Sequence, residues 1–104
     1  MKKKLERADL FHSPGELTKK AELIDDEPSF VEIPTEGKTS GNILLQLNID
    51  QFGTINSLSI LRSSLPHQIE EQVALKFYRA KYRPGEIDGI PVNSEMYVFI
   101  QIED

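Results

Sequence analysis

The most regular hydrophobic pattern lies between residues 41 and 64, GNILLQLNIDQFGTINSLSILRSS. Apolar residues fill alternate positions of its first half, at Ile43, Leu45, Leu47 and Ile49. Strict alternation is typical of a strand with one buried face. The segment Asp50–Gly53 then predicts a tight turn, because Gly53 can adopt the positive φ that such turns require. This half of the stretch therefore predicts the first strand and the turn of a β-hairpin.

The second half continues the hairpin with a change of parity. Its apolar residues are Ile55, Leu58 and Ile60. Because Ile55 lies on the opposite parity from the other two, they can share one face only if a β-bulge absorbs one residue near Asn56 and Ser57. We therefore predict that the second strand is bulged.

A four-residue period replaces the alternation between residues 65 and 84. Ile69, Val73 and Phe77 form an apolar stripe, which Ala74, Ala80 and Tyr82 widen. This spacing predicts an amphipathic helix. Pro66 suits its first helical position, and Pro84 with Gly85 marks its predicted end. Charges complement the helix dipole, with Glu70 and Glu71 near the start and basic residues near the end, at Lys76, Arg79, Lys81 and Arg83.

A third strand is predicted within residues 90–102, after a turn at Asp88 and Gly89. One face of it carries Met96, Val98, Ile100 and Ile102. The other face carries Tyr97, Phe99 and Gln101, which would form an apolar patch with Leu44 and Leu61. Two explanations of this patch remain open: the N-terminal arm covers it, or a partner binds there.

Connectivity then predicts the fold class. A hairpin, a returning helix and a third strand give an α+β protein of β-β-α-β order. Its three-stranded antiparallel sheet has the strand order 2-1-3, and the helix packs on the face lined by Ile43, Leu45, Leu47, Val98 and Ile100. The third strand would be the unprotected edge, since the bulge protects the other one. Residues 1–40 are predicted to be an extended, partly disordered N-terminal arm, and residues 41–104 the folded domain.

Composition excludes several classes of function. A net charge of -5 argues against nucleic-acid binding, which needs a concentrated basic face. The chain has no cysteine, so thiolate metal sites, disulfides and cysteine nucleophiles are excluded. No apolar run reaches the ~20 residues of a membrane span, and the basic start, Met1–Lys4, is not followed by the apolar core of an export signal. The sequence is thus expected to be either a cytoplasmic protein or the soluble part of a longer one.

Candidate catalytic groups are few. His12 and His67 are the only histidines and have no partner at ligand spacing, so we predict no metal site and no cofactor. Ser63 and Ser64 lack an adjacent base or glycine elbow and suit the entry to a helix. Glu70 and Glu71 are adjacent and diverge around the helix, so they do not form an acid and base pair by themselves. We predict a binding protein and no enzyme.

In this order and spacing, the elements resemble the C-terminal domain of TonB-type energy transducers over residues 41–102. The matching features are the glycine at 41 before an alternating strand, the acidic turn with Gly53, the Ser63-Ser64 pair, the helix followed by Tyr82 and Pro84, and the Gly89-x-Pro91-Val92-x-Ser94 run. The segment from Phe11 to Leu23 more loosely resembles the segment that precedes this domain in some related bacterial proteins. Where many members carry Tyr-Pro and alanines before the first strand, this chain has Phe30–Pro34.

The resemblance implies a periplasmic domain, tethered to the inner membrane by an upstream helix and a proline-rich spacer. Such a domain adds the TonB box, an extended peptide near the N-terminus of an outer-membrane transporter, to its sheet edge. It then passes on force from a proton-driven motor. Here the predicted partner-binding residues lie on the third strand: Ser94, Met96, Tyr97, Val98, Phe99, Ile100 and Gln101. The alternative is a scaffold or regulatory protein of the same fold that binds its own copy or another soluble protein.

Overall fold

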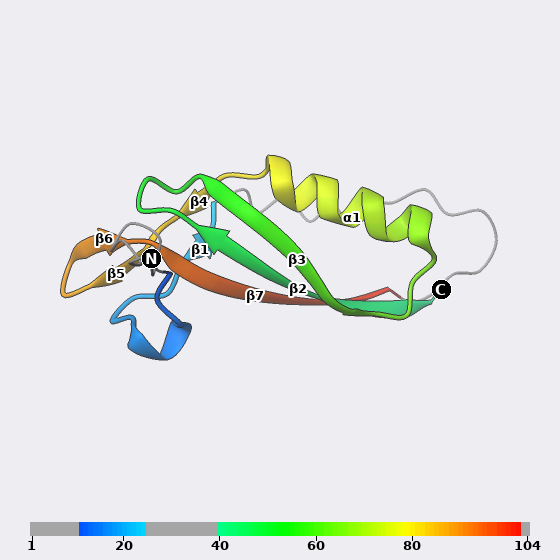
Figure 1. Cartoon of the computed structure of the whole chain (residues 1–104), viewed down its shortest axis with the longest axis horizontal. Helices are drawn as coiled ribbons and strands as arrows, with labels where there is room; N and C mark the ends of the chain where they lie inside the picture. The colour runs from blue at the N-terminus through cyan, green and yellow to red at the C-terminus, as the bar shows by residue number, and fades with distance from the viewer. Residues whose placement is uncertain (1–10, 25–39, 103–104) are drawn as a thin grey trace, which may run out of the picture.

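A computed structural model describes residues 11–24 and 40–102 of the chain (Figure 1). Its elements are η2 (Pro14–Glu16), β1 (Glu22–Leu23), β2 (Gly41–Ile49), β3 (Ile55–Ser63), α1 (His67–Arg79), β4 (Tyr82–Arg83), β5 (Gly85–Ile87), β6 (Ile90–Val92) and β7 (Ser94–Ile102). The predicted disorder of Met1–Ala8 and the departure from the family pattern at Phe30–Pro34 both lie outside the described residues.

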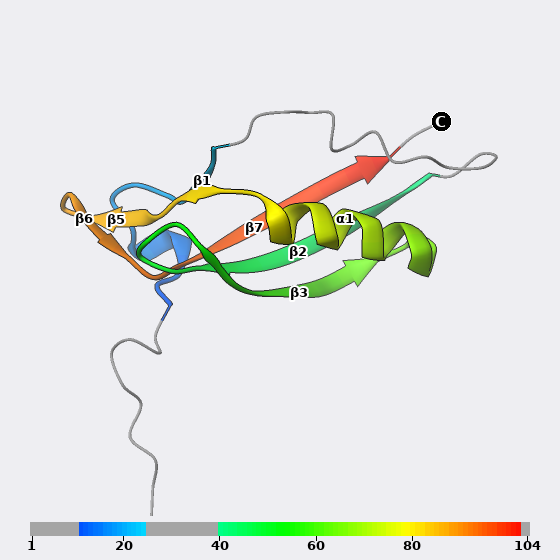
Figure 2. The same ribbon diagram turned by 90° about the horizontal axis from the view of Figure 1, so that it is seen from above.

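The three long strands form an antiparallel sheet in the order β3-β2-β7, and α1 lies over one face of it (Figures 1 and 2). β2 pairs with β7 along its whole length, from Gly41 opposite Ile102 to Ile49 opposite Ser94. The predicted α+β class, with one helix and antiparallel strands, is confirmed for the described residues. The strand count differs, because β1 pairs with β4 and β5 with β6 in two further sheets. These strands of two or three residues are too short to show periodicity in the sequence.

The core lies between α1 and the central sheet. Ile69, Val73 and Phe77 of α1 are buried against the alternating side chains of β2, which are fully buried. Val98 and Ile100 of β7 pack against the same cluster. The predicted stripe and the predicted sheet face are therefore confirmed, and each fully buried aliphatic side chain contributes roughly 1.5 to 3 kcal/mol.

β3 contains the predicted bulge and a second one. Asn48 pairs with Ser57 and Ile49 with Ile55, so Asn56 is the extra residue. Leu44 pairs with Arg62 and Leu45 with Ile60, which makes Leu61 a second extra residue. Ile55 and Leu58 pack against the core as expected, whereas Ile60 is 41% exposed at the edge of the sheet. The outer edge of β3 is thus interrupted twice.

The helix ends earlier than predicted. α1 stops at Arg79 with Ala80 extended, and Pro66 is its N-cap instead of its first helical residue. Tyr82, expected on the helical stripe, belongs to β4 and pairs with Leu23 of β1. Tyr82 is still buried in the core. Its position in the sequence matches the helical period although it belongs to a strand.

The third predicted strand is divided into two. β6 ends at Val92, Asn93 interrupts, and β7 begins at Ser94. Asp88 and Gly89 form the turn between β5 and β6, as predicted, and both have positive φ, 52° and 82°. The Asn93 side chain accepts a hydrogen bond from the Gln51 N–H at 2.9 Å, which ties this break to the β2–β3 turn.

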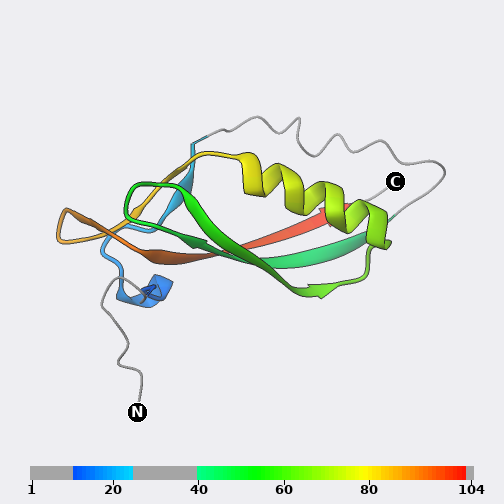
Figure 3. The ribbon, with the colours of Figure 1, turned by 45° about the horizontal axis from the view of Figure 1, so that its top comes forward.

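Residues 11–24, here called the arm segment, are joined to one end of the domain by backbone hydrogen bonds (Figure 3). The Lys19 and Glu86 backbones bond to each other, Ile24 N–H donates to Lys81, and His12 bridges to β7. Ala21 is buried in the core. η2, at the blue end of the ribbon in Figure 1, lies on the side of the sheet opposite α1. Within the described residues, no helix is both long and apolar enough to cross a membrane.

Candidate functional site

The outer edge of β7 is the candidate site, and its first residues are already paired. His12 N–H donates to the carbonyl oxygen of Asn93, and Glu95 N–H donates to the carbonyl oxygen of His12, both at 2.9 Å. This is a parallel bridge between the arm segment and β7. An added strand can therefore use the edge only beyond Glu95.

The His12 bridge also establishes which backbone groups of β7 point outward. Glu95 directs its N–H away from β2, and the β2–β7 register has no shift along its length. Because backbone groups alternate along a strand, Tyr97 and Phe99 also direct their N–H and C=O groups outward. Neither N–H has a hydrogen-bond partner among the residues that the structure describes. The even-numbered residues of β7 bond to β2 instead.

The Tyr97 and Phe99 side chains lie on the sheet face opposite α1, and they are 47% and 60% exposed. The Tyr97 hydroxyl donates to the Glu95 carboxylate at 3.1 Å. Partial desolvation raises the pKa of Tyr97 above its ordinary value, and the hydrogen bond to Glu95 and the charge of that carboxylate raise it further. The exposed part of the edge thus carries two aromatic side chains beside its unpaired backbone groups.

The predicted site residues separate into groups. Ser94 is fully buried, and its Oγ accepts a hydrogen bond from Gly85 N–H at 3.1 Å, so we remove it from the candidate set. Met96, Val98 and Ile100 pack against the core and their backbone pairs with β2, so their role is to hold the edge in place. Tyr97, Phe99 and Gln101 alternate with these residues and belong to the positions whose backbone groups point away from β2. Leu44 is half-buried and Leu61 is exposed on the bulge.

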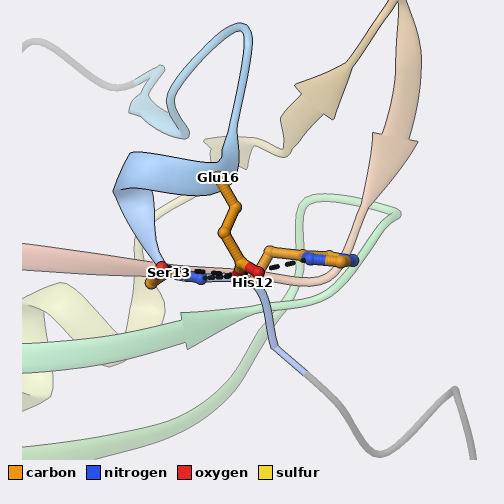
Figure 4. Close-up of polar contacts among 3 residues, drawn as sticks. All are labelled: His12, Ser13 and Glu16. Atoms are coloured by element: carbon orange, nitrogen blue, oxygen red, sulfur yellow. Dashed lines mark hydrogen bonds and ion pairs between the residues drawn. The ribbon is translucent and has the colours of Figure 1, made fainter.

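A short polar cluster holds the arm segment where it leaves β7 (Figure 4). The Glu16 Oε1 atom accepts hydrogen bonds from Ser13 N–H at 2.8 Å and from Ser13 Oγ at 3.3 Å. His12 Nδ1 lies 3.4 Å from the same oxygen. The backbone hydrogen bond from Ser13, and secondarily the His12 contacts, lower the pKa of Glu16. The Ser13-x-x-Glu16 spacing is a capping pattern that could have identified this turn from the sequence.

A hollow of about 290 Å³ opens between the arm segment and β7. It is lined by Pro14, Lys20, Ala21, Glu95, Met96 and Tyr97. The β7 residues of this lining are those where the His12 pairing ends and the unpaired edge begins. Sequence patterns missed the hollow, because residues about 75 positions apart form it and no period links them.

The other polar candidates from the sequence, His67, Ser63 and Ser64, make contacts that suit structural roles. His67 is exposed on the first turn of α1, 3.5 Å from Glu70 and 3.3 Å from Glu71. Ser63 Oγ accepts from Leu65 N–H, and Ser64 Oγ accepts from Asn42 N–H, both at 3.0 Å. Within residues 11–24 and 40–102, no three His, Asp or Glu side chains lie close enough to hold a metal ion.

Comparison with known proteins adds no assignment: no protein-family model matches this chain, and no curated protein matches it.

Proposed function

We propose that this chain is a protein-binding domain that captures an extended peptide by strand addition along β7. The unpaired, outward backbone groups of Tyr97 and Phe99 carry this proposal. Main-chain hydrogen bonds to the added strand supply affinity, and the side chains beside the edge supply selectivity.

The two edges of the sheet differ in a way that favours β7. β3 is interrupted by bulges at Asn56 and Leu61, and bulges discourage pairing with another strand. β7 pairs with β2 without a shift and contains no proline. A regular edge presents its donors and acceptors at the spacing that another strand requires.

The resemblance to TonB C-terminal domains gives this proposal its biological form. In that form the domain lies in the periplasm, is tethered to the inner membrane, and receives the TonB box of an outer-membrane transporter as part of an energy transducer. The β-β-α-β order of the three long strands and α1 supports it. The proposal involves no cofactor, metal ion, nucleic acid or catalytic step.

The decisive experiment is an NMR titration of the labelled domain with peptides from the N-termini of outer-membrane transporters. We expect the largest shifts at the amides of Tyr97 and Phe99. Tyr97→Pro removes one outward N–H and should abolish binding while the sheet stays folded. Tyr97→Ala keeps that N–H and should weaken binding only modestly.

Two further proline variants make the test specific. Ile60→Pro alters the outer edge of β3, which is not the proposed binding edge, so binding should remain intact. The sheet should stay folded, because Ser59 and not Ile60 bonds to β2 in the alternating ladder. Val98→Pro breaks a β2–β7 hydrogen bond and should unfold the sheet. If saturating peptide shifts only the β2–β3 turn or the arm segment, strand addition at β7 is wrong.

A further inference from the structure

We infer that the hollow beside the arm segment receives the end of the added strand, with one aliphatic side chain inside it and a carboxylate of the ligand next to Lys20. This inference rests on the proposed function and names the chemistry of the peptide. It depends on Lys20 and on the lining that the arm segment contributes, which strand addition does not need, so the two can fail separately.

The position of the hollow limits how far an added strand can extend. His12 occupies the edge at Asn93 and Glu95, and the hollow begins at Glu95, Met96 and Tyr97. A strand that bonds to Tyr97 and Phe99 therefore meets the arm segment after one more residue. It must end or turn away there, and its last side chain lies at the hollow.

The lining determines which side chain fits. Pro14, Ala21, Met96 and the ring of Tyr97 supply apolar surface. A volume of about 290 Å³ is large enough for one side chain of the size of leucine or methionine. Burial of an aliphatic side chain in such a pocket is favourable in proportion to the apolar area removed from water.

The charges at the rim determine the neighbouring group. Two ionic side chains line the hollow, Lys20 and Glu95. The Glu95 carboxylate accepts a hydrogen bond from the Tyr97 hydroxyl. Lys20 has no ion-pair partner within the described parts of the chain. The Tyr97 hydroxyl is neutral, so the Glu95 charge remains, and a ligand carboxylate complements the hollow only where it lies beside the Lys20 ammonium.

Such a carboxylate has two sources, an Asp or Glu side chain or the C-terminus of the ligand. Selection from two libraries of short random peptides distinguishes them. One library ends in a free carboxylate, and in the other the C-terminus is fused to the carrier. We expect binders with an aliphatic residue beside an acidic group, and binders from the free-ended library alone would identify the C-terminus.

Charge reversal tests the role of Lys20. Lys20→Glu should weaken the selected acidic peptides about fivefold, the effect of one well-placed ion pair, and should select basic residues in their place. Lys76→Glu on α1, remote from the hollow, should change neither affinity nor selection. Replacing the aliphatic residue of the peptide by glycine should also weaken binding.

The outcomes separate the two proposals. If selected peptides shift the Tyr97 and Phe99 amides but bind Lys20→Glu with unchanged affinity and no acidic preference, the inference about the hollow is wrong and strand addition stands. If neither library yields a peptide that shifts these amides, strand addition is overturned and the hollow inference with it.

Discussion

The Tyr82 hydroxyl donates a hydrogen bond to the backbone carbonyl oxygen of Phe77, with 2.6 Å between the two oxygens. Phe77 lies in the last turn of α1, and Tyr82 lies in β4. The same carbonyl also accepts a longer hydrogen bond from the Ala80 N–H, at 3.3 Å, so Tyr82 supplies the second and shorter bond to a carbonyl at the helix C-terminus. It also joins the helix to the strand that pairs with the arm segment.

Tyr82→Phe should lower the free energy of unfolding by about 0.5 to 1.5 kcal/mol, because the Phe77 carbonyl then keeps only the longer bond from the Ala80 N–H. Denaturant melts measure the loss. Tyr78→Phe is the matched control, since Tyr78 is 51% exposed on α1. Equal losses in the two variants would contradict a structural role for the Tyr82 hydroxyl.

Alkaline pH tests the burial of the same side chain. Burial raises the pKa of Tyr82, so the folded state keeps this phenol neutral where an unfolded chain ionises it. Its contribution is present below the ordinary pKa of about 10 and is lost as the pH rises above that value. Stability of the wild type should fall above about pH 10, and this fall should be smaller in Tyr82→Phe. Identical pH dependence in both proteins would argue against the prediction.

Phe77→Ala should cost about 3 to 5 kcal/mol and leave the domain largely unfolded at 37 °C, because Phe77 is central to the buried stripe of α1. Leu75→Ala on the exposed side of the same helix should stay within about 0.5 kcal/mol of the wild type. Urea denaturation followed by circular dichroism measures both. A loss below about 1 kcal/mol for Phe77→Ala would show that the helix docking is not as described.

The central sheet and α1 were predictable because their side chains repeat at the periods of a strand and a helix. Ile43 to Ile49 and Ile69 to Phe77 each carry enough repeats to identify an element. The bulge at Asn56 was predictable from a parity conflict. The bulge at Leu61 was not, because Leu58 and Ile60 share one parity and show no conflict there.

The ends of elements and the arm contacts depend on long-range pairing. Tyr82 fits the helical period, yet its pairing with Leu23 and its bond to Phe77 place it in a strand. For the candidate site, the sequence indicated β7. It did not indicate which residues of β7 direct their backbone groups outward, or that His12 pairs with the start of this strand. Both follow from hydrogen bonds between residues about 80 positions apart, and no local pattern encodes them.

Glycine substitutions test the β2–β3 turn. Gly53 has φ 87°, and a Cβ atom there would overlap the carbonyl oxygen of Tyr82. Gly89 has φ 82° with nothing near its Cβ position. Gly89→Ala should therefore cost about 1 to 2 kcal/mol for the left-handed backbone alone, and Gly53→Ala distinctly more. Gly15→Ala, with open space and no positive φ, is the neutral control, and equal thermal stability of all three variants would contradict the described packing of the turn.

Glu16 makes attachment of the arm segment pH-dependent. The Ser13 N–H bond lowers the pKa of Glu16, so its contribution is present above the ordinary carboxyl pKa of about 4.3 and is lost as the pH falls through its lower folded value. Glu16→Gln should speed hydrogen exchange of the Glu95 amide at neutral pH, whereas Glu71→Gln should not. If exchange at Glu95 is the same in both variants, the cluster does not hold the arm segment.

Self-association through β7 is the last prediction. Two copies can pair their β7 edges antiparallel about a two-fold axis, since the edge of each presents unpaired groups at Tyr97 and Phe99. His12 occupies the start of each edge, so the overlap is confined to the few residues beyond Glu95 and association should be weak, with dimers forming only near millimolar concentration. Tyr97→Pro should abolish the dimer in sedimentation experiments and Ile60→Pro should keep it. A strict monomer at millimolar concentration would contradict the prediction, and a dimer that survives Tyr97→Pro would place the contact elsewhere. Peptide that dissociates the dimer would show that both ligands compete for the same edge.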